Sequence, residues 1–235
     1  MWDWLAVLSV LAVIFPFPRL PTCEQSFRNA QYGFNQPPSV GKILVANEKL
    51  EDPNFAHSVV LILQSDPDVG RVGLIINRRT AIPISKIFSK MEHASADPVY
   101  MGGPVDTTAV EALLRLSEKA AQTIHIMSDV YATGAKELID KSIASRVSPS
   151  KFHLYLGYAA WAPGQLEAEI QLGAWTVLSH DLKIVFDADP DSLWSRLSDE
   201  SQMQIASART SRSKILDPLT EPGVPPSGSA PLSPW

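Results

Sequence analysis

The chain has 235 residues, with 20 lysines and arginines against 25 aspartates and glutamates, which gives a formal net charge of −5. Proteins that bind nucleic acid normally carry a clustered basic face, and here the basic residues are dispersed, so we do not expect direct nucleic-acid binding. One cysteine, Cys23, excludes an internal disulfide, and five singly spaced histidines show no zinc-ligand spacing, so we expect no metal and no cofactor.

The chain opens with an apolar stretch. Residues 4–17 are almost wholly apolar, shorter than the roughly 20 residues of a membrane-spanning helix but of a length typical of a signal peptide. The preceding residues carry no positive charge, and residues 20–23 faintly resemble a lipoprotein cleavage site ending at Cys23. Three interpretations of residues 1–22 stay open: export with cleavage, membrane association as an anchor, or an extension without a structural role. We favour export or anchoring, and we interpret residues 23–40 as a linker.

A turn follows the first predicted strand of the folded region. In Asp52-Pro53-Asn54-Phe55 the carboxylate of Asp52 can accept from free backbone N–H groups, and Pro53 sets φ for the start of a turn. Phe55 then enters the core before the buried strand predicted over residues 58–63. The alternative is a ligand site lined by the polar side chains of this turn: Asp52, Asn54, His57 and Ser58.

A second strand with Gly73 is predicted over residues 72–76, and residues 64–70 read as the turn of a hairpin. The strand ends at Asn77, Arg78 and Arg79, where two guanidinium groups could bind an anion. We favour a solvated strand end.

Two glycine-containing segments come next. Gly102-Gly103-Pro104 predicts a tight turn, because a glycine pair permits positive φ and close backbone contact. No nucleotide-binding glycine pattern occurs in the chain, so a phosphate site there has no motif support.

The last segment, Gly157 to Glu167, closes an apolar strand and opens a helix predicted over residues 163–172. Trp161 and Trp175 flank that helix, and a buried indole needs a partner for its N–H. A pocket is the alternative, lined by Tyr158, Trp161, Gln165 and Glu167.

Strands and helices mix without regular βαβ alternation, which predicts an α+β fold with a mixed or largely antiparallel sheet in one domain over residues 41–200. The predicted strands are 42–46, 58–63, 72–76, 99–101, 123–127, 152–158, 174–178 and 183–186. The predicted helices are 84–91, 134–145, 163–172 and 191–197. Residues 201–235 form an extension, with either a helix or a frayed segment to residue 216 and then a disordered tail rich in proline, glycine and serine.

Taken in order, the four segments resemble the AlgH/YqgE family, from about residue 41 to about residue 194. The resemblance implies a curved sheet, partly closed like a small barrel and surrounded by helices, in proteins that are generally cytoplasmic. Members are often described as transcriptional regulators, without a settled biochemical activity. The residues that carry the resemblance, as structural or binding positions, are Asp52, Pro53, Asn54, Phe55, Gly73, Asn77, Arg78, Gly102, Gly103, Pro104, Gly157, Tyr158, Trp161, Gly164, Gln165 and Glu167.

Two functional hypotheses follow. The first is a non-enzymatic binding or regulatory protein that acts through an unidentified protein partner or a small ligand. The second is a hydrolase-like enzyme with a polar pocket near Asp52, His57 and Ser58, or near Tyr158 and Glu167. We favour the first, because the sequence contains no known nucleophile or metalloprotease motif and assigns no catalytic residue.

Overall fold

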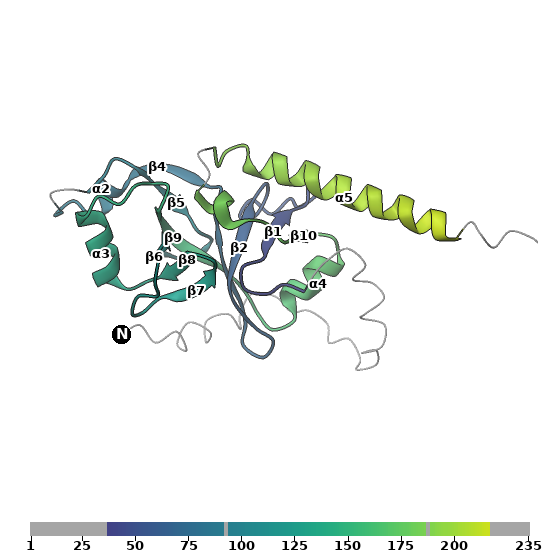
Figure 1. Ribbon diagram of the computed structural model, residues 1–235, viewed down its shortest axis with the longest axis horizontal. Helices are drawn as coiled ribbons and strands as arrows, with labels where there is room; N and C mark the ends of the chain where they lie inside the picture. Colours follow the sequence, from purple (N-terminus) through teal and green to yellow (C-terminus); the bar gives the residue numbers. More distant parts are fainter. Residues whose placement is uncertain (1–36, 92–93, 187–188, 217–235) are drawn as a thin grey trace, which may run out of the picture.

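The computed structural model describes residues 37–91, 94–186 and 189–216 (Figure 1). Our predictions for residues 1–36 and 217–235 lie outside these ranges. The elements, in chain order, are β1 (Ile43–Ala46), β2 (Val59–Asp66), β3 (Gly70–Ile75), β4 (Arg79–Pro83), α2 (Ile84–Ile87), β5 (Pro98–Met101), β6 (Val105–Arg115), β7 (Ile124–Met127), β8 (Val130–Thr133), α3 (Lys136–Ala144), β9 (Phe152–Trp161), α4 (Gln165–Gln171), β10 (Trp175–Leu178), the 3₁₀ helix η2 (Leu182–Phe186) and α5 (Leu193–Leu216). The α+β class is confirmed.

The strands form one ten-stranded sheet in the order β10-β1-β2-β3-β9-β6-β8-β7, with β5 pairing β9 and β4 pairing β5. Every pairing is antiparallel except that of β5 with β9, so the predicted mixed sheet is confirmed. The sheet is not closed as a barrel, because its end strands β10 and β7 do not pair with each other. It curves far enough that a Cβ built on Gly41, just before β1, would lie 3.4 Å from the Ile126 carbonyl oxygen of β7. Figure 1 shows α2 and α3 at one end of the molecule and α4 and α5 at the other.

Apolar side chains alternate along the strands and form three clusters, as expected when both faces of a sheet are covered. The inner cluster includes Leu61, Leu74, Leu113 and Tyr155. The α4 cluster includes Ile62, Trp161, Leu166 and Trp175, and the α3 cluster includes Ala112, Leu114, Ile139 and Leu154. Neighbouring residues of one strand, such as Leu113 and Leu114, therefore serve different cores.

Four features differ from the sequence-based expectations. Residues 183–186 form η2 and not a strand, because Asp181 starts a helical turn by accepting from the Lys183 N–H at 2.9 Å with its carboxylate and from the Ile184 N–H at 3.3 Å with its carbonyl. Strands β4, β6 and β8 were not predicted. Helix α2 ends at Ile87, short of the predicted residue 91. Helix α5 continues past the predicted residue 197 to Leu216, which settles the open alternative for residues 201–216 in favour of a helix.

Three glycines let β5, β6 and β9 meet with their backbones in contact. Gly102 donates to the Leu156 carbonyl at 2.8 Å, and its own carbonyl accepts from the Ile75 N–H at 2.8 Å. A Cβ on Gly102 would lie 2.3 Å from the Gly157 oxygen, and one on Gly103 would lie 2.1 Å from the Tyr158 carbonyl carbon. These positions therefore accept only glycine without movement of the backbone.

We expect Gly102→Ala to lower the free energy of unfolding by about 3 kcal/mol, because the added methyl group meets backbone atoms that cannot move aside cheaply. Urea denaturation measures the change. Gly173→Ala is the matched control: its φ is +80° but nothing lies within 4 Å of the added Cβ, so it should lose only about 1 kcal/mol. Equal losses in the two variants would contradict the close backbone packing.

Candidate functional site

The first family segment forms a tight loop between β1 and β2. Asp52 organises it: its carboxylate accepts from the Asn54 N–H at 2.8 Å, and its carbonyl accepts from the N–H groups of Phe55 at 2.9 Å and Ala56 at 2.7 Å. The predicted use of the Asp52 side chain as an acceptor of backbone N–H groups is what the structure shows.

Asn77 and Arg78, just beyond β3, hold this loop by its backbone. The Asn77 side chain accepts from the Val59 N–H at 2.8 Å and donates to the His57 carbonyl at 3.0 Å. The Arg78 guanidinium donates to the carbonyls of Asn54 at 2.7 Å and Ala56 at 3.3 Å. We call these four contacts the Asn77–Arg78 clamp. Burial lowers the pKa of Arg78 below its usual value, against a weaker opposing effect of the Asp52 carboxylate.

The two adjacent arginines do not converge on one anion. Arg78 is used on loop carbonyls, whereas Arg79 forms an ion pair with Asp191, which precedes α5. Each guanidinium thus has a partner within the chain.

Aromatic rings and one carboxylate connect the loop to the fourth segment. Phe55 stacks on Trp161 with ring centroids 5.8 Å apart and meets Trp175 edge-on at 5.5 Å. Glu169 of α4 accepts from both indole N–H groups, at 3.0 Å for Trp161 and 2.8 Å for Trp175. Our sequence analysis missed Glu169, although two tryptophans flanking a helix with an acid between them was a usable signal.

Gln165 belongs to the same network. Its amide donates to Glu169 at 2.9 Å and its carbonyl accepts from the Ala162 N–H at 3.1 Å, so it holds the start of α4 and the acceptor of the indoles together. The side chain has a structural role in these contacts.

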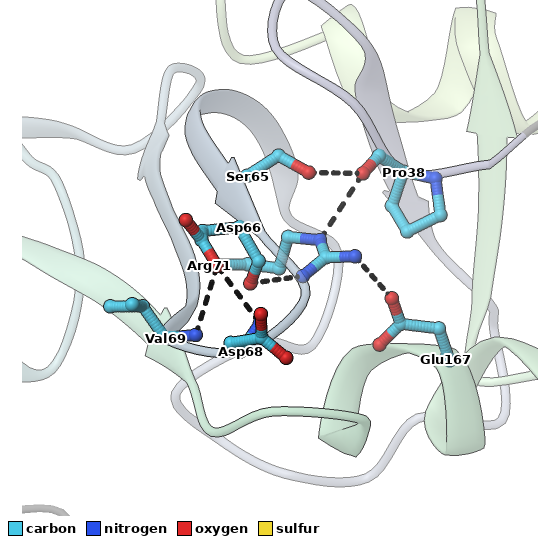
Figure 2. A network of polar contacts seen from close by, with 7 residues as sticks. All are labelled: Pro38, Ser65, Asp66, Asp68, Val69, Arg71 and Glu167. Atoms are coloured by element: carbon cyan, nitrogen blue, oxygen red, sulfur yellow. Dashed lines mark hydrogen bonds and ion pairs between the residues drawn. The ribbon is translucent and has the colours of Figure 1, made fainter.

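Glu167 faces a different group. Figure 2 shows its carboxylate on the guanidinium of Arg71, which also donates to the carbonyls of Pro38 at 3.2 Å and Asp66 at 2.8 Å. The Ser65 hydroxyl donates to the same Pro38 carbonyl at 2.8 Å. The Arg71 side chain is only 8% exposed, so it needs the negative partner that α4 supplies.

Neither predicted hydrolase constellation is assembled. The Ser58 hydroxyl donates to the Phe55 carbonyl at 2.7 Å, and the His57 ring packs on Trp194 with centroids 4.2 Å apart. Tyr158 lies in the inner cluster while Glu167 is on α4, paired with Arg71.

Two buried ionisable groups on the inner face of the sheet also escaped the sequence analysis. Glu111 of β6 is 7% exposed, and burial raises the pKa of its carboxyl to about 7. Burial lowers the pKa of His153 on β9 to about 4, against weaker opposing effects of a hydrogen bond with the Val185 backbone and of Asp97. Such shifts are enriched at functional sites, and only the strand register reveals that these residues face inward.

An open hollow of about 360 Å³ lies beside the C-terminal end of α4, and we call it the α4 hollow. Its lining residues are Asn47, Lys49, Leu50, Leu172, Gly173 and Ala174. Leu172 is 81% exposed there. Within the described ranges no group of three or more histidines, cysteines or acids is placed to hold a metal ion. Nor does any described helix have the length and apolarity to cross a membrane.

Comparison with known proteins finds relatives of this sequence. Residues 43–206 match the family described as AlgH-like. The UPF0301 protein of Thermobifida fusca is 36% identical over 166 residues, which cover 67% of this chain and 84% of that protein. The UPF0301 protein azo3459 of Azoarcus sp. is 34% identical over 154 residues, 63% of this chain and 81% of that protein.

A solved structure agrees with the fold. The solution structure of the AlgH protein from Pseudomonas aeruginosa superposes with a TM-score of 0.56 at 25% identity, covering 81% of this chain and 99% of that one.

The two buried groups described above, Glu111 and His153, should each make the free energy of unfolding depend on pH, in opposite directions. The folded pKa of Glu111 is raised from 4.5 to about 7, so its contribution is present below pH 4.5 and is lost as the pH rises through 7. The folded pKa of His153 is lowered from 6.5 to about 4, so its contribution is present above pH 6.5 and is lost as the pH falls through 4. We expect Glu111→Gln to gain stability relative to the unmodified protein by about 3 kcal/mol as the pH rises across the Glu111 window.

Chemical denaturation at several pH values measures this difference. Glu137→Gln, at an exposed acid on α3, serves as the control and should show no comparable trend. His153→Gln should gain relative stability in the opposite direction, as the pH falls. A Glu111→Gln curve parallel to that of the unmodified protein would rule out a neutral buried carboxyl.

Proposed function

Because the chain belongs to the AlgH-like family, we propose that it is a non-enzymatic binding protein that acts through a protein partner. The observation that carries this proposal is the use of the family-segment side chains. Asn77, Arg78 and Gln165 bind backbone groups of their own fold, and Glu167 neutralises a buried arginine. These side chains stabilise the fold. Among them, no nucleophile, general base and hydrogen-bond donor converge on one point, as a catalytic site would require.

The α4 hollow is the surface that best suits a partner. A single exposed leucine is ordinary on a protein surface, but Leu172 and Leu50 both line the same hollow, and Leu172 is 81% exposed. Lys49 also lines the hollow, so the lining combines apolar side chains with one basic residue. A protein segment that presents an apolar side chain with an acid beside it fits this arrangement.

A protein partner is favoured over nucleic acid by the state of the basic side chains. Arg71, Arg79, Arg115, Lys136 and Lys183 each face a carboxylate within the described chain. Since phosphate contacts dominate nucleic-acid affinity, cations already paired in the fold are poorly suited to it. A regulatory role, if the protein has one, would then operate through protein contact. No observation favours the hydrolase alternative, because its candidate groups bind elsewhere.

We expect Leu172→Asp to weaken partner capture by at least about tenfold, because it places a carboxylate in an apolar contact. Tagged full-length protein is crosslinked in native lysate and the recovered proteins are quantified by mass spectrometry. Val69→Asp is the control, since Val69 is an apolar residue 43% exposed and is not among the residues that line the hollow.

The control variant should recover the same partners as the unmodified protein. Recovery of no specific partner by the unmodified protein would overturn the proposed function. Equal recovery by Leu172→Asp would overturn the assignment of the α4 hollow.

A further inference from the structure

Helix α5 packs on the body of the molecule only over its first part. Leu193 and Leu197 are buried in the inner cluster, and the Trp194 indole donates to a backbone carbonyl of β1 at 2.8 Å. Ser201 is the last residue of the helix that is described as buried. Figure 1 shows the distal half of α5, residues 203–216, extending past the sheet and the other helices.

The distal half is poorly suited to stand alone in water. It spans about 20 Å, and a free helical segment of this length is marginal because most helical stability in proteins comes from packing. Cations suit the carboxyl end of a helix, but the effect falls off within the last turn, so it accounts for Lys214 and not for Arg209. A contact outside the body of the chain would stabilise this half.

Charge is divided between α5's distal half and the residues before it. Residues 189–202 contain four acids and one arginine, whereas residues 203–216 contain three basic residues and no acid. No ion pair can therefore form within the distal half itself. The acids are Asp189, Asp191, Asp199 and Glu200, and the distal basic residues are Arg209, Arg212 and Lys214.

An exposed apolar pair lies where the two charged parts meet. Met203 is 68% exposed and Ala206, three residues on, is also exposed, so the two are neighbours on one face of the helix. Asp199, four residues before Met203, is exposed on the same face. This face therefore runs from an acid, through apolar side chains, toward the basic half.

The order of these charges along the helix selects the partner. When two identical helices lie antiparallel, the acidic part of each faces the basic part of the other, and the residues around Met203 meet their own copies near the two-fold axis. A parallel pair would set acid against acid and base against base. An unrelated acidic surface would suit the distal half alone, whereas a second copy suits both parts at once.

We propose that α5 is a self-association surface, through which two copies of the chain pair their α5 helices antiparallel. The acidic part of one helix lies opposite the basic part of the other, and Met203 and Ala206 pack at the centre. The family match ends at residue 206, so this surface extends beyond the region that the chain shares with its family. The pairing is independent of the α4 hollow and of the function proposed for it.

The test is sedimentation velocity of the full-length protein, from low micromolar to a few hundred micromolar concentration, at low and at high salt. The distal reversal, Arg209→Glu with Arg212→Glu, places acids opposite acids in the proposed pair. The proximal reversal, Asp199→Lys with Glu200→Lys, places bases opposite bases. A chain with all four substitutions again has opposite charges facing each other.

The matched control is Lys86→Glu with Lys90→Glu. It makes the same change of net charge as the distal reversal, at two exposed lysines in and just after α2, at the other end of the molecule. Circular dichroism and urea denaturation show whether each variant is folded. The distal reversal and its control decide the outcome if the proximal reversal does not fold.

We expect the unmodified chain to dimerise, with a dissociation constant at least about tenfold larger at high salt, because the paired charges are then screened. Each reversal should weaken dimerisation by at least about tenfold, the chain with four substitutions should recover it, and the control should leave it unchanged. A chain that is monomeric throughout, or a dimer insensitive to the distal reversal, would overturn the proposal.

The same variants identify a different occupant of α5. A monomeric chain could bind vesicles of phosphatidylserine and phosphatidylcholine, or duplex DNA, in a way that the distal reversal abolishes. That result would overturn the pairing of two copies and assign the basic half of α5 to another anionic surface.

Discussion

The fold depends on the way Asn77 and Arg78, just beyond β3, bind the backbone of the loop between β1 and β2 and hold it in one conformation. In the Asn77–Arg78 clamp, Asn77 binds one backbone N–H and one backbone carbonyl, and Arg78 binds two backbone carbonyls. Fixing the loop fixes Phe55, which is the ring that meets both Trp161 and Trp175. Helix α4 is then positioned by Glu169, which accepts from those two indoles.

The same framework accounts for most of the polar side chains of the family segments. Hydrogen-bonding capacity within the family segments is directed at backbone, indole or a buried counter-ion, so these segments stabilise a scaffold. The open hollow with the exposed Leu172 lies outside these segments, at the C-terminal end of α4. Many folds carry their binding positions outside the residues that stabilise the framework.

Sequence reasoning succeeded where local chemistry decides. The acceptor role of Asp52, the glycine-permitted contacts at Gly102 and the need of the tryptophans for a partner each follow from one residue type and its neighbours. It failed where the answer depends on residues far apart in the chain. Which acid of α4 serves the indoles, Glu167 or Glu169, depends on the position of Arg71, 96 residues from Glu167. Strand β6 was hidden because its first half is a polar bulge, and the inward direction of Glu111 is known only from its pairing with Tyr155.

Native-state amide hydrogen exchange in Arg78→Met tests the central claim most directly, because this variant keeps much of the side-chain volume and removes the donors to the loop. The account predicts at least about tenfold faster exchange at the amides of Phe55 and Ala56, with the amides of β6 unchanged. Unchanged protection throughout the loop would contradict it, since the Arg78 guanidinium would then be dispensable to the fold and available for another task.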